Sequence, residues 1–141
     1  MLNTVVNAVA PWVNPVIDYH ALAPEMVLAA GLCVVLLADL FMDESLKWIL
    51  SSLAGFTLLG AMLPVLTLGL HDTDVRSMFD GRYVVDNFSL VIKALFLLAG
   101  YVVVLLSSNH VEEDEYWRGE YYFLLLSSIL GMVMISSSRD L

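Results

Sequence analysis

The sequence has few basic residues and a single cysteine. Lysine and arginine number six against 15 acidic residues, so the formal net charge is −9 at pH 7. A basic surface for nucleic acid is therefore missing, and we expect no nucleic-acid partner. The one cysteine, Cys33, cannot form a disulfide within the chain and is interpreted as a small apolar filler. The N-terminal residues also lack the basic region with which a secretory signal begins.

Extended polar stretches are equally scarce, because 60% of the 141 residues are hydrophobic. A soluble domain of this length cannot bury so much apolar surface in its core. Four apolar runs, at residues 24–42, 47–70, 87–107 and 120–138, are long enough to cross a bilayer. Their connections are short, so neighbouring runs are antiparallel. The sequence predicts an all-α polytopic membrane protein with four antiparallel transmembrane helices.

The N-terminal segment, residues 1–23, has apolar residues near helical spacing that are interrupted by Pro11 and Pro15. Trp12 is suited to the depth of the lipid headgroups. We expect an interfacial segment that lies along the membrane surface, and a flexible tail is the alternative.

The rest of the chain divides into two parts. Residues 24–119 contain the first three helices, and residues 120–141 contain the fourth. Between the second and third helices, Asp80-Gly81 lies among apolar and β-branched residues, which predicts a short hairpin near residues 78–85.

Motifs for chemistry are missing from the sequence. It has no metal-ligand cluster, nucleophile motif or phosphate-binding loop, and its three histidines lie far apart and outside the apolar runs. We therefore expect no catalytic, cofactor-binding or metal-binding residue in this chain. No apolar run has an acid, lysine or histidine at its centre, so the chain is expected to be scaffold rather than a complete proton pathway.

Three charged residues, Glu25, Asp39 and Lys93, lie within the first and third apolar runs. Lys93 is about 9 Å along the third helix, and its stem allows the ammonium to reach the interface. Alternatively, Lys93 forms an intramembrane ion pair with Glu25, because the first and third helices cross the membrane in the same direction. Asp39, near the end of the first run, is interpreted as an interfacial carboxylate rather than a proton carrier.

Small residues at four-residue spacing predict close contacts between helices. Ser127 and Gly131 have this spacing in the fourth run, and Ser51 and Gly55 have it in the second. Residues 29–31 form a similar thin patch in the first run. We expect replacement of Gly131 by leucine to disturb packing around the fourth helix.

Three segments carry a family resemblance: LAPEMVLAAGLCVVLLADLF, VVDNFSLVIKALFLLAGYVVVLLS and RGEYYFLLLSSILGMVMISSSRDL. They resemble subunit N of the proton-pumping NADH:quinone oxidoreductase, respiratory complex I. The likeness covers residues 20–141, and residues 119–141 are its most specific part. It implies the N-terminal portion of an antiporter-like 14-helix subunit, with residues 120–141 as the truncated start of the first inverted repeat.

The resemblance also implies a function. Members of the family are membrane-arm subunits of a translocase that couples electron transfer from NADH to quinone to proton translocation, in the bacterial plasma membrane. FMN, iron–sulfur clusters and quinone are expected elsewhere in the complex, with none in this subunit. The implied partners are the antiporter-like subunit M, the small subunits K and J, and lipid. The family's proton path uses a glutamate on the fifth helix and lysines on the seventh, eighth and twelfth helices. The resemblance matches this chain to the first four helices, so none of these proton-path residues is assigned to it.

Two alternatives stay open. The chain is also compatible with a stand-alone four-helix scaffold or assembly protein that pumps nothing. A subunit of a multisubunit cation/proton antiporter is the other possibility, since those proteins are relatives of subunit N.

Overall fold

The computed structural model describes residues 17–43, 48–71, 75–78, 81–111 and 118–138. Most of the segment for which an interfacial position is expected, residues 1–23, lies outside these ranges.

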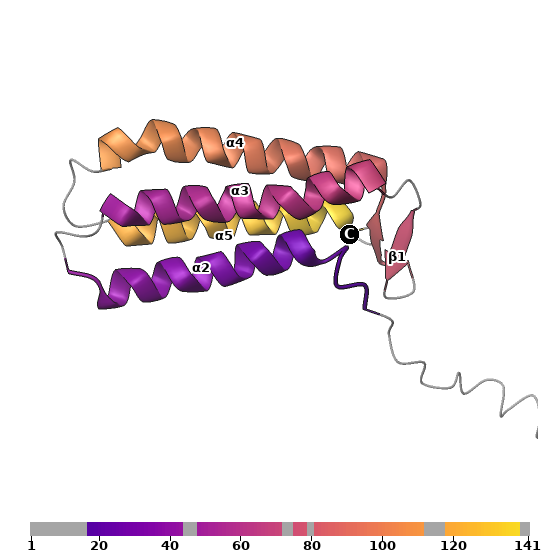
Figure 1. Cartoon of the computed structure of the whole chain (residues 1–141), viewed down its shortest axis with the longest axis horizontal. Helices are drawn as coiled ribbons and strands as arrows, with labels where there is room; N and C mark the ends of the chain where they lie inside the picture. Colours follow the sequence, from indigo (N-terminus) through magenta and orange to yellow (C-terminus); the bar gives the residue numbers. More distant parts are fainter. Residues whose placement is uncertain (1–16, 44–47, 72–74, 79–80, 112–117, 139–141) are drawn as a thin grey trace, which may run out of the picture.

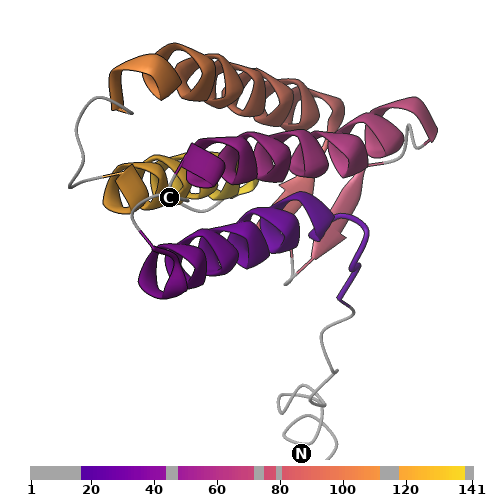
Figure 2. The same ribbon diagram turned by 60° about the vertical axis from the view of Figure 1, so that its left-hand side comes forward.

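Four long helices form an antiparallel bundle (Figures 1 and 2). They are α2 (Ala23–Phe41), α3 (Trp48–His71), α4 (Asn87–Val111) and α5 (Arg118–Ser137). Each is long and apolar enough to cross a membrane, which confirms the predicted fold class. Helix α2 packs against α3 and α5, and α4 packs against the same two helices. Helices α2 and α4 therefore lie at opposite corners of the bundle.

The helix starts follow from local sequence. In α2, Pro24 stands in the first turn, where its missing N–H costs no hydrogen bond, and Glu25 complements the positive end of the helix. In α4, the Ser89 backbone N–H donates to Asp86 Oδ1 at 2.8 Å, and the Asp86 N–H donates to Ser89 Oγ at 3.0 Å. This reciprocal cap satisfies backbone donors that the first turn leaves free.

Two short antiparallel strands lie between α3 and α4, at one end of the bundle (Figure 1). They are β1 (Arg76–Met78) and β2 (Tyr83–Val85). Gly81, between them, has a φ of 83°, a backbone conformation that glycine adopts without a steric penalty. Tyr83 also pairs with Ser138, just after α5, so the hairpin is attached to the end of that helix.

Two glycines allow the helices to approach closely. A Cβ on Gly31 would collide with Thr57 of α3, and a Cβ on Gly100 would collide with Ile129 of α5. Of the thin patch expected at residues 29–31, only Gly31 faces a neighbouring helix, since Ala29 and Ala30 are exposed. Close contact at small residues is the usual way in which membrane helices gain packing energy.

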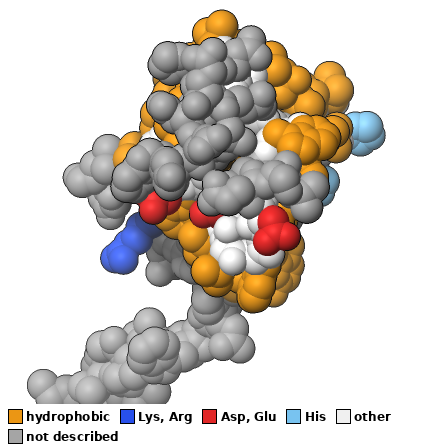
Figure 3. Space-filling model, turned by 90° about the vertical axis from the view of Figure 1, so that its left-hand side faces the viewer, with side chains coloured by type: hydrophobic (Ala, Val, Ile, Leu, Met, Phe, Trp, Pro, Cys, Tyr) orange, Lys and Arg blue, Asp and Glu red, His pale blue; other side chains and the backbone are white. Residues whose placement is uncertain are grey.

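The outer surface of the bundle is apolar. Leucine, valine and phenylalanine side chains on all four helices are exposed, as a protein facing lipid requires. Figure 3 views the end away from the hairpin, with apolar side chains around the periphery and acidic side chains at the end itself. Cys33 is exposed on this outer surface, so it does not fill the core as expected.

Candidate functional site

A buried polar cluster lies at the hairpin end of the bundle. Lys93 is six residues past Asn87 in α4, and its Nζ lies 2.6 Å from Oε1 of Glu25 in α2. The Lys93 side chain is 0% exposed and that of Glu25 is 5% exposed. Because α2 and α4 occupy opposite corners, the lysine stem extends across the bundle to reach its partner. The structure therefore has the paired arrangement, and the ammonium does not extend to the interface.

Tyr83 of β2 completes the cluster. Its hydroxyl donates to Glu25 Oε1 at 2.6 Å and accepts a hydrogen bond from Lys93 Nζ at 3.0 Å. The ammonium also lies 5.3 Å from the centre of the tyrosine ring, within the range of a cation–π interaction. The sequence contains no motif that singles out Tyr83. Its place beside the hairpin turn was the one available signal.

Burial raises the pKa of the Tyr83 hydroxyl, and the hydrogen bond and negative charge of Glu25 raise it further. The hydroxyl therefore stays protonated at neutral pH and acts as a donor. Glu25 Oε1 therefore accepts two charge-assisted hydrogen bonds, one from the Tyr83 hydroxyl and one from the Lys93 ammonium. A buried carboxylate needs such partners to offset its loss of hydration.

Two further polar atoms adjoin the cluster. Glu25 Oε2 and Ser137 Oγ are buried, and the Ser137 hydroxyl lies beside that of Tyr83, where it lowers the tyrosine pKa. Ser137 is the last residue of α5, and Ser138 after it pairs with Tyr83. The cluster thus joins parts of the chain that are far apart in sequence: the starts of α2 and α4, the hairpin and the end of α5.

Chemically, the cluster suits a structural contact better than a metal site. It has one carboxylate, already paired with an ammonium, and no group of histidine, cysteine or acidic residues able to hold a metal occurs in the described part of the chain. Removal of either charged partner would leave an uncompensated charge in a buried position, which is strongly unfavourable.

Asp39 lies at the opposite end of the bundle, in the last turn of α2. It is partly buried, and its carboxylate lies against Gly119, where a Cβ would collide with it. Gly119 is the second residue of α5, so the carboxylate stands near the positive end of that helix dipole. Its role as an interfacial carboxylate stays a prediction.

Ser127 and Gly131 do not form the expected contact within this bundle. Both are exposed, and nothing lies within 4 Å of a Cβ placed on Gly131. The face of α5 that packs against the other helices carries Tyr122, Leu126 and Ile129 instead. The spacing of the two small residues was recognised correctly, but the rotation of α5 about its axis places them outside.

No protein-family model matches the chain, and no solved structure matches it. Several curated proteins named NADH-quinone oxidoreductase subunit N do match. The one from Thioalkalivibrio sulfidiphilus is 33% identical over 121 residues, which cover 86% of this chain and 25% of the relative. The one from Anoxybacillus flavithermus is 36% identical over 126 residues, covering 88% and 25%. The one from Acidithiobacillus ferrooxidans is 39% identical over 115 residues, covering 80% and 23%.

The chain therefore spans about a quarter of the length of the curated relatives it matches. These matches confirm the resemblance inferred from the three sequence segments. Over most of its own length, the chain is similar to one part of NADH-quinone oxidoreductase subunit N.

Proposed function

We propose that this chain is part of subunit N in the membrane arm of an NADH:quinone oxidoreductase that couples electron transfer to proton translocation. The observation that carries this proposal is similarity to curated subunit N proteins over four-fifths or more of the chain, together with four helices long enough to cross a membrane. On this proposal the chain is the N-terminal portion of the subunit, in a bacterial plasma membrane.

Within that complex, we propose a mainly structural role for these four helices. In the described helices, the acidic and basic side chains lie toward the helix ends, with Lys93 six residues into α4 as the deepest. Proton pathways through membranes use ionisable groups deeper than this. No cofactor is needed for such a role, and the exposed apolar faces are suited to contact lipid and neighbouring subunits, for which we propose M, K and J.

The buried cluster is proposed to fix the hairpin to the bundle. Tyr83 links β2 to Glu25 of α2 and Lys93 of α4, while the Tyr83–Ser138 bridge holds the end of α5. This set of contacts attaches the end of α5 to the hairpin. We therefore expect it to affect assembly more than the pumping of assembled complexes.

The proposal is tested by deleting the gene and measuring NADH-driven proton uptake in inverted membrane vesicles. We expect NADH-driven uptake to be lost while succinate-driven uptake is kept. A tagged copy of the complete gene should restore uptake, and its product should co-purify with NADH:quinone oxidoreductase activity.

Other outcomes would favour the alternatives. Unchanged NADH-driven uptake, with the tagged chain found apart from the oxidoreductase, would indicate a stand-alone scaffold. Loss of sodium/proton exchange without loss of NADH-driven uptake would indicate a cation/proton antiporter subunit.

The structural role is tested in the same vesicles with Lys93→Met. Glu120→Gln on α5 is the matched control, because Glu120 is exposed. We expect Lys93→Met to lower the amount of assembled complex while protons pumped per NADH stay unchanged. Normal assembly with a lower proton yield would contradict a structural role for the cluster.

A further inference from the structure

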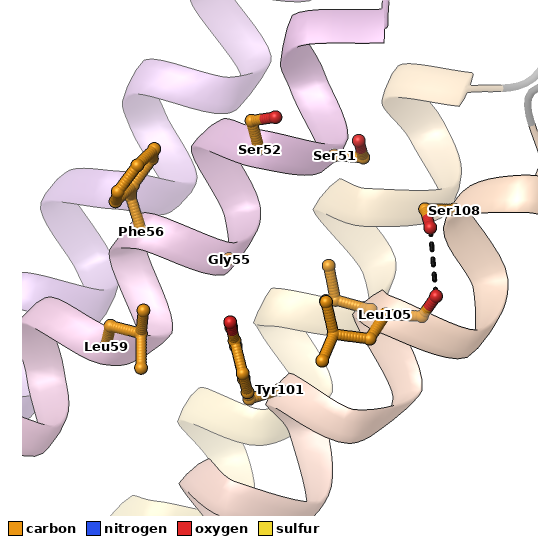
Figure 4. A pocket seen from close by; sticks show the side chains of 9 residues that line it. Ser51, Ser52, Gly55, Phe56, Leu59, Tyr101, Leu105 and Ser108 are labelled. Atoms are coloured by element: carbon orange, nitrogen blue, oxygen red, sulfur yellow. Dashed lines mark hydrogen bonds between the residues drawn. The ribbon is translucent and has the colours of Figure 1, made fainter.

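We draw no further inference here: the strongest candidate, the groove of about 300 Å³ between α3 and α4 at the bundle end opposite the hairpin (Figure 4), carries none, because nothing in the described part of the chain shows what covers it.

Discussion

The contact between Lys93 and Glu25 leads to a prediction that a double-mutant cycle can measure. Lys93→Met and Glu25→Met each keep most of the side-chain volume and remove one charge. Each single replacement leaves the other charge buried, with 0% and 5% of the two side chains exposed. A buried charge without its partner costs ~3–5 kcal/mol of unfolding free energy.

The double variant removes both charges at once. Its apolar side chains still fill the space, so the large penalty disappears, and the remaining cost is the loss of partners for the Tyr83 hydroxyl, ~1–3 kcal/mol. The double variant should therefore be more stable than either single variant. This inversion is specific to a pair in direct contact, because replacements at independent sites add.

The assay is reversible unfolding of the purified chain in mixed detergent micelles, followed by circular dichroism. Glu120→Met serves as the control, since Glu120 is exposed and its replacement should change the free energy by less than ~0.5 kcal/mol. Single variants that each cost less than ~1 kcal/mol and add in the double variant would refute the buried pair.

Three further predictions concern other contacts. Because the pKa of Tyr83 is raised in the folded chain, the unfolded chain loses this proton first, so the unfolding free energy should fall above pH ~10 by up to ~1.4 kcal/mol per pH unit. Tyr83→Phe should flatten this slope in alkaline unfolding curves, and an unchanged slope would count against the raised pKa. Gly31→Ala should cost ~1–3 kcal/mol because its Cβ collides with Thr57. Adding Thr57→Ala should recover most of that loss in the same unfolding assay, and strict additivity would contradict the contact. Gly131→Leu should leave the stability of the chain within ~0.5 kcal/mol of its parent, since nothing lies near it, whereas a cost above ~1 kcal/mol would indicate a contact that the structure lacks.

The helices could be predicted because the signal is carried by each segment alone. An apolar run such as that in α3, residues 48–71, has to form a helix in lipid, where no water is present to satisfy backbone groups. The length and composition of a run are then sufficient to predict its helix. The same argument could not give the rotation of each helix about its axis, because apolar residues surround the helices on every side.

The rotation of the helices explains why the contact predicted at Ser127 and Gly131 is absent and why the contact at Gly100 was not predicted. Ser127 and Gly131 have the spacing of a helix contact, yet they face away from the bundle. Gly100, in an unremarkable apolar context, lies at the close contact with Ile129. Spacing alone predicts that two residues share a face and does not tell which face is buried.

The polar cluster, too, was predicted only in part from the sequence. That Glu25 and Lys93 lie near the same membrane surface follows from their positions near the starts of two helices that run in the same direction. That Lys93 crosses the bundle to reach a helix at the opposite corner follows only from the packing of four helices, which buries the stem and leaves Glu25 as the acceptor for its ammonium. Tyr83 joins them because the hairpin lies against the same end.

By itself, the sequence determined that this chain has four helices long and apolar enough to cross a membrane and that it resembles subunit N, because apolar length and local motifs do not depend on neighbours. Only the tertiary structure decided which polar groups meet and which glycines lie in contacts. Those outcomes depend on how each helix is rotated about its axis and on which helices are its neighbours. Because each helix is apolar on nearly every side, the sequence of one segment does not specify either.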